Sequence, residues 1–375
     1  MKVLYIGHFT EGTGWSKAAF DNVKSLDAVG VDVVCRNISL SQSSDGRIQE
    51  IEHLFRKDLK NVDHCVQHVL PHFINYTDNF KKNIAYFPAG ETNTIKYTTW
   101  HNSLKLVDEV WVSCTDGQKS FVEDSIENTF LVPHAFDISK YEVDPLNAVT
   151  LSVGMPGAFK FYYIGDVSDR KNIDSIIKCF HSEFTNDEPV ELVLKVNKFG
   201  MDDQALYQAV AQMCDSIKKS LKIYRDPTYY RREIIIPSKL PEKDIENLHR
   251  SCHCFVLPSH GEGFSLPSFD AMAFGNTPIC SNNGGPKDFI DPQNKNTGWL
   301  VDGVYDVCQD TNAAFDFINT GREEWFHPSH REIKKAMRYY YENRHSKDKK
   351  QGLEQAKNNS LEKIGNIMKE RLLNE

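Results

Sequence analysis

Short apolar runs alternate with amphipathic stretches along most of the chain, a pattern typical of parallel strands connected by helices. In the first part it predicts strands at Val3–Ile6, Val31–Cys35, Val62–Val69, Ile84–Phe87, Val110–Ser113 and Thr129–Val132. It predicts helices at Ser16–Ala28 and Gly46–Leu59, and another from Gly117. We therefore expect a Rossmann-like α/β domain over residues 1–150.

The segment Asn147–Phe159 is rich in small residues, with two glycines and a proline, and is interpreted as an interdomain linker. The alternation then restarts. Strands are predicted at Phe161–Ile164, Val190–Val196, Ile234–Ile236, Phe255–Leu257 and Pro278–Ser281, and helices at Asn172–Phe184, Glu242–Ser251 and Pro267–Phe274. We expect a second Rossmann-like domain over residues 151–345. Residues 346–375 contain a charged amphipathic helix, Gly352–Leu373.

Composition agrees with two α/β domains in a protein without a membrane span. A chain of 375 residues is too long for one ordinary core. No apolar run approaches the roughly 18 residues that a membrane span needs, and the N-terminus is typical of a first strand and not of a signal peptide. The net charge of −8 argues against a generally basic nucleic-acid coat, although a local basic groove stays open. Nine cysteines without a pairing pattern favour reduced thiols and a cytoplasmic location.

Two segments contain residue types that bind metals. Cys252-His253-Cys254 lacks a second pair of ligands and continues into an apolar run, which favours a core strand. His64, His68 and His72 are spaced by four, but Pro71 and the apolar surroundings favour a strand and a turn. Because that spacing does not converge on a strand, we expect no metal site.

The most informative segment, residues 255–275, reads FVLPSHGEGFSLPSFDAMAFG and has the order strand, glycine-flanked loop, helix. Pro267 suits the first helical turn, where its missing N–H would be unpaired. The backbone amides of Gly263, Phe264 and Ser265 are predicted to donate to an anion.

Two carboxylates of this segment, Glu262 and Asp270, are eight residues apart. Since a carboxylate accepts two donors at once, one can hold sugar hydroxyls and the other ribose hydroxyls. The alternative is an ordinary loop residue at Glu262 and a solvated helix position at Asp270. That interpretation fits an isolated acidic pair but not the full string.

The string EGFSLPSFDAMAFGNTPIC resembles the E-x7-E segment of the retaining GT-B glycosyltransferases of family 4. Further similar segments are Tyr163–Asn172, Ser281–Ile290, Gly298–Val301, Asp108–Val112, Val132–Asp137 and Ala89–Thr92. The resemblance covers nearly the whole chain. It implies a GT-B fold, in which two Rossmann-like parallel-sheet domains face a central cleft, and a C-terminal helix that packs back toward the first domain.

The resemblance also implies a donor-binding set in the second domain: for the diphosphate Arg170, Lys171 and Lys195, for the transferred sugar Glu262, for the ribose Asp270, and for the base Lys239. By residue type alone, Arg170 and Lys171 also fit a solvated loop, and Lys195 fits a strand-end side chain that reaches water. Asp270 departs from the usual glutamate of the family, and Ser265 from a common glycine.

A glycine-containing loop, Gly7–Ser16, follows the first predicted strand. Gly12 and Gly14 allow a tight turn and a close approach of backbone to phosphate. Lys17 stands where a dinucleotide-binding loop has its third glycine, and the second strand ends without the acidic residue that holds an NAD ribose, which argues against a dehydrogenase. The resemblance implies that this loop covers the donor phosphates.

Three further side chains are candidates in the first domain. His68 is a catalytic candidate, and His8 and Glu91 are candidate contacts for the acceptor. A single histidine is more often a structural residue than a functional one, and both interpretations stay open for His8 and His68.

The predicted function is retaining transfer of a hexose or a pentose from a nucleoside-diphosphate-sugar donor to an acceptor hydroxyl. No metal is expected, because no D-x-D sequence occurs. The acceptor is a glycan, a lipid-linked sugar or a hydroxymethylated base in phage DNA, since residues 3–19 resemble openings of glycosyltransferases from large tailed phages. The basic, aromatic stretch Lys222–Arg232 supports a nucleic-acid surface or is a helix end and solvated turn. The alternatives are a non-catalytic sugar-nucleotide-binding protein and an epimerase. We expect a monomer or dimer, in the host cytoplasm if phage-encoded.

Overall fold

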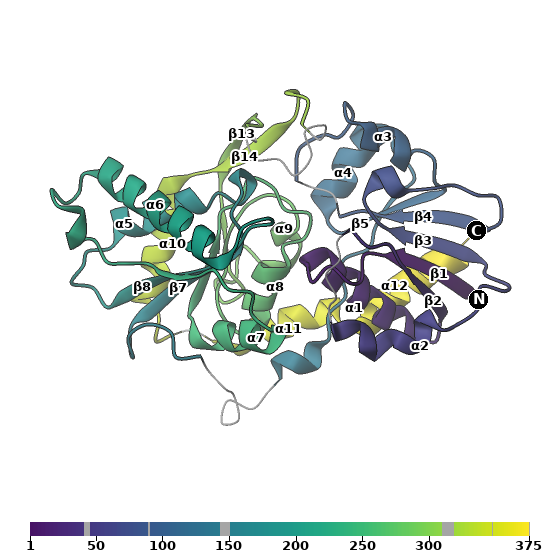
Figure 1. The fold of residues 1–375 in the computed structure, drawn as a ribbon, viewed down its shortest axis with the longest axis horizontal. Coiled ribbons are helices and arrows are strands. Elements are labelled where there is room, and N and C mark those ends of the chain that lie inside the picture. Colours follow the sequence, from purple (N-terminus) through teal and green to yellow (C-terminus); the bar gives the residue numbers. More distant parts are fainter. Residues whose placement is uncertain (41–45, 89–90, 143–150, 310–318, 347, 375) are drawn as a thin grey trace. The chain divides into compact units, whose positions relative to one another are not determined.

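A computed structural model describes residues 1–40, 46–88, 91–142, 151–309, 319–346 and 348–374 (Figure 1). Its contacts divide the chain into two compact units. Unit 1 comprises Met1–Lys140, Phe315–Glu323 and Lys357–Glu375, and unit 2 comprises Tyr141–Ala314 and Glu324–Ala356. The predicted domain boundary at residue 150 lies outside the described residues. The predicted linker ends one residue too late, because Phe159 already begins a strand.

Unit 1 contains a six-stranded parallel sheet, in the order β2-β1-β3-β4-β5-β6. Its strands are β1 (Lys2–Gly7), β2 (Asp32–Asn37), β3 (His64–His68), β4 (Lys82–Tyr86), β5 (Glu109–Val112) and β6 (Thr129–Leu131). The six predicted strands are thus confirmed. Its longer helices are α1 (Gly14–Ala28), α4 (Thr115–Glu123) and α12 (Leu361–Leu373), with a shorter α3 at Thr99–Leu104 that the pattern did not predict.

The helix predicted over Gly46–Leu59 is confirmed only as far as Phe55, and it is not one regular α-helix. The structure has a 3-10 helix, η1 (Gly46–Ile51), followed by one short helix, α2 (Glu52–Phe55). The guanidinium of Arg36 donates to the carbonyl oxygens of Phe55 (3.1 Å) and Lys57 (3.0 Å). These tertiary hydrogen bonds capture carbonyl groups that a longer helix would use, so the helix ends there.

Unit 2 contains a second six-stranded parallel sheet, in the order β12-β11-β10-β7-β8-β9. Its strands are β7 (Phe159–Asp166), β8 (Val190–Asn197), β9 (Ile234–Ile236), β10 (Cys254–Leu257), β11 (Ile279–Ser281) and β12 (Trp299–Val301). Its helices are α5 (Ile173–Glu183), α6 (Asp203–Leu221), α7 (Glu242–Ser251), α8 (Leu266–Ala273), α9 (Pro286–Phe289), α10 (His330–Glu342) and α11 (Lys350–Ala356). Two further strands, β13 (Gly303–Val307) and β14 (Glu324–Pro328), form an antiparallel pair.

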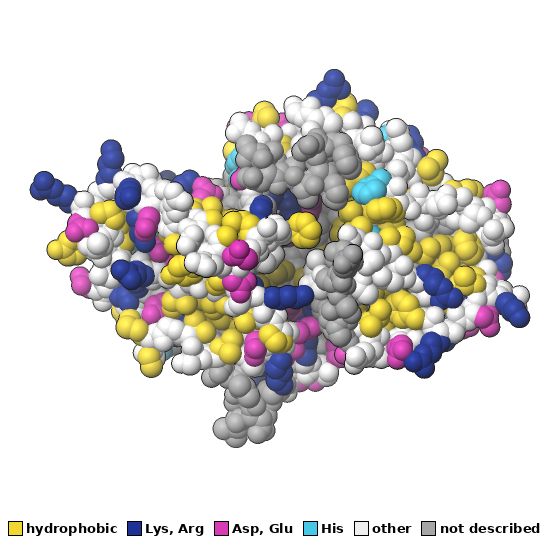
Figure 2. Space-filling view, in the orientation of Figure 1, with side chains coloured by type: hydrophobic (Ala, Val, Ile, Leu, Met, Phe, Trp, Pro, Cys, Tyr) yellow, Lys and Arg dark blue, Asp and Glu magenta, His cyan; other side chains and the backbone are white. Residues whose placement is uncertain are grey.

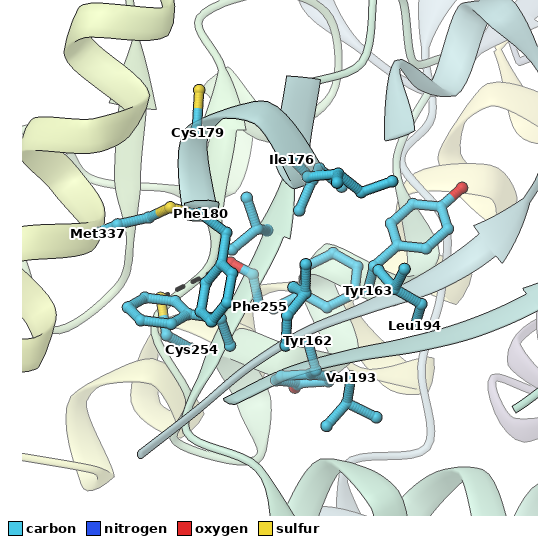
Figure 3. Close-up of a cluster of buried hydrophobic side chains, with 14 of the residues drawn as sticks. Tyr162, Tyr163, Ile176, Cys179, Phe180, Val193, Leu194, Cys254, Phe255 and Met337 are labelled. Atoms are coloured by element: carbon cyan, nitrogen blue, oxygen red, sulfur yellow. Dashed lines mark hydrogen bonds between the residues drawn. The ribbon is translucent and has the colours of Figure 1, made fainter. Parts of the chain in front are cut away.

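The core of unit 2 lies between the sheet and its covering helices (Figure 3). Tyr162 and Tyr163 of β7 and Phe255 of β10 are fully buried there, with Phe180 of α5 and Met337 of α10 packed against the same cluster. Burial of Phe159–Tyr163 in β7 and of Val190–Val196 in β8 explains why these strands are mainly apolar on both faces, with Lys160, Glu191 and Lys195 as the buried charged exceptions.

The predicted helix Gly352–Leu373 is also wrong as one element. The chain forms α11 in unit 2, a 3-10 turn η7 (Lys357–Asn359), and then α12 in unit 1. Asn359 O accepts from Phe136 N (2.8 Å), and the Ser360 side chain caps α12 by accepting from Lys363 N. Because the Ser360 hydroxyl and the backbone bond from Phe136 to Asn359 replace helical hydrogen bonds, the helix is interrupted between residues 357 and 360.

Within the described ranges, every helix is too short or too polar to span a lipid bilayer. All nine cysteines are buried free thiols, and Cys254 lies in β10 as the pattern predicted. Figure 2 shows basic and acidic side chains interspersed over the visible face, with yellow apolar side chains between them.

Candidate functional site

Two loops of unit 2 meet at the carboxyl ends of the neighbouring parallel strands β7 and β10. The amide of His260 donates to Arg170 O (2.8 Å), and Asn172 Nδ2 donates to Pro258 O (2.9 Å). Asn172 has a left-handed backbone (φ 55°) and begins α5. These bonds hold the loop with the basic pair Arg170 and Lys171 against the loop after β10, at the edge where open α/β sheets bind ligands.

Glu262 forms a buried ion cluster with both cations. Lys171 Nζ lies 2.7 Å from Glu262 Oε1 and 3.0 Å from Oε2, and Arg170 Nη1 lies 3.4 Å from Oε1. The side chains are 6% exposed for Glu262, 15% for Lys171 and 23% for Arg170, so the basic pair is not a solvated loop. Burial raises the pKa of the Glu262 carboxyl, but Lys171 and then Arg170 outweigh burial and hold it below its usual value.

A glycine pair fits directly against the Glu262 loop. Gly285 N donates to Glu262 O (3.2 Å), and a Cβ on Gly285 would lie 2.3 Å from Phe264 Cα. A Cβ on Gly284 (φ 67°) would lie 2.1 Å from Glu262 O. The sequence indicates the segment Ser281–Ile290 only through its resemblance to the family. The structure shows that the segment supports this loop.

Ser265 stands at the start of α8 with a left-handed backbone, φ 75° and ψ 65°. Its Oγ lies 2.7 Å from Ser268 Oγ in the first helical turn, and Pro267 occupies that turn as predicted. Left-handed backbone is the conformation that favours glycine, so replacement of the usual glycine places an ordinary side chain at a strained position.

Asp270 is buried on α8 and is not a solvated helix position, because only 9% of the residue is exposed. The hydroxyl of Tyr141 donates a hydrogen bond to Asp270 Oδ1. Sequence reasoning missed Tyr141, whose partner lies 129 residues away and leaves no local signal.

The remaining two residues predicted to bind the nucleotide-sugar, Lys195 and Lys239, form no hydrogen bond or ion pair with the Glu262 cluster among the described residues. Lys195 is buried in β8, where its Nζ donates to Val196 O (3.0 Å) and burial lowers its pKa. It therefore does not reach water as a strand-end side chain would. Among the described residues, no hydrogen bond or ion pair joins Lys195 to Glu262, Arg170 or Lys171. Lys239 is exposed in the loop after β9.

In unit 1, His8 follows β1 and His68 ends the neighbouring strand β3. The side chain of Trp15 lies against both histidines. The ring of Trp15 is centred 6.4 Å from that of His8 and 5.4 Å from that of His68, and its Nε1 donates to His68 O (3.2 Å). Trp15 belongs to α1, which begins at Gly14 beyond the left-handed Gly12 (φ 64°). The sequence did not single out Trp15.

Both histidines are buried, and burial lowers their pKa values, that of His68 well below its usual range. His8 Nδ1 lies 2.7 Å from Ile38 O, and His68 Nδ1 lies 2.9 Å from Tyr5 Oη. His68 Nε2 is buried and makes no hydrogen bond to any described residue. The predicted strand and turn around them are confirmed, because β3 ends at His68 and a 3-10 turn, η2 (Pro71–Phe73), follows.

Two other predictions concern exposed segments. Glu91 is exposed, and the adjoining residues Ala89 and Gly90 of the similar segment lie outside the described residues. In Lys222–Arg232, α6 ends at Leu221 and a 3-10 turn, η6 (Pro227–Tyr229), follows, which matches the interpretation as a helix end and turn. A surface hollow is lined there by Tyr224, Tyr229 and their neighbours.

Comparisons with known proteins agree with this geometry. Residues 155–309 match the sequence model of the family described as Glycosyl transferases group 1. The serotype-specific mannosyltransferase WbdA of Escherichia coli is 23% identical over 154 residues, which cover 40% of this chain and only 17% of that relative. This chain therefore spans only a small part of the length of that relative.

Among solved structures, HepE of Anabaena in complex with UDP and glucose is similar with a TM-score of 0.68 and 13% identity, covering 99% of each chain. Sucrose-phosphate synthase of Thermosynechococcus elongatus is similar with a TM-score of 0.64 and 13% identity, covering 99% of this chain and 98% of that one. The chain has the GT-B fold, and its residues 155–309, which carry the Glu262 cluster and Asp270, match the group 1 glycosyl transferase family.

Proposed function

We propose that this protein is a retaining glycosyltransferase that moves a sugar from a nucleoside-diphosphate sugar to an acceptor hydroxyl. The observation that carries the proposal is the buried cluster of Glu262 with Lys171 and Arg170, at the carboxyl ends of two parallel strands. One carboxylate suited to sugar hydroxyls and two cations suited to a diphosphate are held in a single loop junction.

The proposed reaction breaks the bond between the anomeric carbon and the diphosphate oxygen and forms a bond to the acceptor oxygen. Negative charge grows on the leaving diphosphate, and Lys171 and Arg170 stabilise it, together with loop amides from Gly263 to Ser265. We propose that the diphosphate replaces Glu262 as their partner, while Glu262 holds the sugar. The acceptor approaches on the face of the leaving group, whose phosphate takes the acceptor proton. Two cations supply the charge, so the proposal includes no metal.

The donor is proposed to carry a hexose. The name of WbdA as a mannosyltransferase and the UDP and glucose bound to HepE support this choice. The ribose is proposed to lie at Asp270 and the base near Lys239. For the acceptor, the three predicted classes, a glycan, a lipid-linked sugar and a hydroxymethylated DNA base, stay predictions. His68, His8 and Glu91 stay candidate residues for that side of the reaction.

The test is thermal stabilisation by UDP, GDP, ADP and their hexose conjugates, with and without EDTA. One nucleotide should raise the melting temperature irrespective of EDTA, because a ligand that binds only the native state stabilises it. The Lys171→Met variant should lose this response. The control Lys178→Met, which removes a partly exposed lysine paired with Asp174 on α5, should keep it.

Failure of all nucleotides to stabilise the wild-type protein, or an undiminished response in Lys171→Met, would overturn the proposal. Slow hydrolysis of the stabilising nucleotide-sugar without an acceptor separates a transferase from a pure binding protein, which releases no sugar. Activity with Glu262→Ala equal to that of the wild type would overturn the assignment of the sugar site.

A further inference from the structure

The second carboxylate of the site has a partner that the E-x7-E string does not contain. Tyr141 is the last residue of a 3-10 helix, η3 (Ile138–Tyr141), at the point where the chain enters unit 2. Its hydroxyl donates to Asp270 Oδ1. A residue outside the matched segment 155–309 thus contacts the proposed ribose carboxylate directly.

The contact is built by packing and does not depend on a mobile side chain. Tyr141 is only 7% exposed, and its ring meets that of Phe274 edge-on at 4.8 Å between centroids. Phe274 caps α8, and its amide donates to Asp270 O (2.9 Å). The guanidinium of Arg250 lies over the same ring at 4.7 Å. The tyrosine ring is therefore fixed against the helix end that carries Asp270.

The chemistry of the pair matches a vicinal diol. The 2′- and 3′-hydroxyl groups of a ribose are two adjacent donors, which require two adjacent acceptors. A carboxylate accepts about four hydrogen bonds, so one bond from tyrosine does not exhaust it. A phenolic oxygen that donates its proton to the carboxylate keeps the ability to accept. With the shorter aspartate in place of glutamate, the tyrosine oxygen extends the acceptor surface.

We propose that Tyr141 is a positioning residue of the ribose site, which orients Asp270 and makes the Asp270–Tyr141 pair the unit that recognises the ribose diol. The inference rests on the proposed function, because it requires the donor ribose to lie at Asp270. It assigns to Tyr141 the selection of ribonucleotides over 2′-deoxyribonucleotides.

The experiment compares two variants, each of which removes one buried tyrosine hydroxyl in unit 2. Tyr141→Phe removes the donor to Asp270, and the control Tyr340→Phe removes a hydroxyl of similar burial that donates to Lys295 O (2.9 Å). The dissociation constants of UDP, GDP, ADP and their 2′-deoxy counterparts are measured by calorimetry. The wild type should prefer its ribonucleotide by about tenfold, the typical effect of one hydrogen bond to a charged group.

Tyr141→Phe should lose most of this preference, whereas Tyr340→Phe should keep it. Equal weakening of ribo- and deoxyribonucleotides by Tyr141→Phe, or a preference that it leaves intact, would overturn the role of Tyr141 while leaving the proposed function in place. Absence of wild-type binding for every nucleotide would overturn the proposed function and the inference with it.

Discussion

Glu262 satisfies two cations that are predicted to serve a ligand. Its carboxylate contacts Lys171 with both oxygens and Arg170 with one, in a nearly buried loop. A buried charge is tolerated only with partners, so the two cations and the carboxylate stabilise one another in the absence of any diphosphate. The proposed ligand must therefore exchange one set of ion pairs for another.

Removing this carboxylate charge should separate its structural effect from anion binding. Glu262→Gln keeps the shape but removes the negative charge beside Lys171 and Arg170, and should lower the free energy of unfolding by about 2–3 kcal/mol. This is below the usual cost of breaking a fully buried pair, because both cations are partly solvated. Inorganic pyrophosphate should raise the melting temperature of the variant more than that of the wild type, since the anion replaces the lost carboxylate.

The matched control is Glu233→Gln, which breaks another buried cluster, with Lys218 (3.0 Å) and His181. This variant should also lose stability. Pyrophosphate should not raise its melting temperature, because the Lys218 side chain is only 6% exposed and is not accessible to the anion. An equal response in both variants would contradict anion binding at Lys171 and Arg170. Scanning fluorimetry gives both results.

Two histidines of unit 1 should make the protein sensitive to mild acid. Burial lowers the pKa of His134 from 6.5 to about 3, and that of His68 well below its usual range. A histidine whose pKa is lower in the folded state contributes stability that is present above its unfolded pKa and lost as the pH falls. As the pH falls from about 6.5 to 5, each of these histidines should therefore lower the free energy of unfolding by at most ~1.4 kcal/mol per pH unit.

Urea unfolding at several pH values checks this slope. His134→Asn removes one of the histidines whose pKa is lowered by burial, so the stability of this variant should fall less steeply with decreasing pH than that of the wild type. An unchanged slope in this variant would show that His134 is not neutral and buried in the native state.

At the scale of elements, the loop that carries Glu262 is fixed by backbone requirements on both sides. On one side of the loop, Ser265 has a left-handed backbone. On the other side, Gly284 and Gly285 lie so close to the loop backbone that a Cβ atom on either glycine would clash with it. The loop therefore cannot move away from the loop of Arg170 without disturbing the start of α8 or of α9 (Pro286–Phe289).

Position 265 should reverse the usual order of helix-forming residues. Ser265→Gly relieves about 1 kcal/mol of left-handed strain, which offsets the lost hydrogen bond to Ser268, whereas Ser265→Ala loses the bond and keeps the strain. In urea denaturation, the glycine variant should be more stable than the alanine variant by about 1 kcal/mol.

The exposed Ser216 within α6 serves as the comparison, because alanine is favoured over glycine by about 1 kcal/mol at an ordinary helical position. The same order of stability at both positions would mean that the backbone at Ser265 is not left-handed.

These elements also show what the sequence could predict. The strands of both six-stranded sheets other than β12 are predictable, because burial on both faces leaves short apolar runs such as Val110–Val112 and Phe255–Leu257. The errors at Gly46–Leu59 and Gly352–Leu373 come from hydrogen bonds to Arg36 and Phe136, which are distant in sequence. The β13–β14 pair lacked a short turn signal, because 16 residues separate Val307 from Glu324.

The candidate site was predictable only in its local part. Glu262, Arg170 and Lys171 lie in segments whose residue types and spacing are distinctive, and the structure brings these three together. Their roles toward a substrate stay predictions. Tyr141, Trp15 and the support from Gly284 and Gly285 depend on contacts between distant segments, and no local pattern in the sequence indicates such contacts.

At the scale of the whole molecule, unit 1 is assembled from discontinuous parts of the chain. Helix α12 packs on α1, where Ser25 Oγ donates to Leu361 O and Lys369 Nζ donates to Val29 O (2.7 Å). Ile364, Met368 and Leu372 of α12 complete the core of unit 1. Unit 2 is inserted between these parts and has its own sheet and core.

The two units should respond to different perturbations. A Cβ on Gly365 would lie 2.3 Å from Ser25 O, so Gly365→Val should destabilise unit 1 by about 2–3 kcal/mol despite the better helix propensity of valine. Calorimetry should show one transition lowered by this variant and another raised by the stabilising nucleotide. The control Asn366→Val, at an exposed position of α12, should leave both transitions unchanged. A single transition that shifts in both experiments would contradict independent units.

The pairing of α1 with α12 has a consequence for biosynthesis. On the ribosome, Ser25 emerges 336 residues before its partner Leu361, whereas every part of unit 2 has been translated once Ala356 is added. We therefore expect unit 2 to complete its fold before unit 1, opposite to the usual order in which the N-terminal domain folds first. In the nascent chain, the face of α1 that packs on α12 stays uncovered until α12 has been translated. A chain that ends before Leu361 would contain the whole second unit but would lack α12, which completes the core of the first.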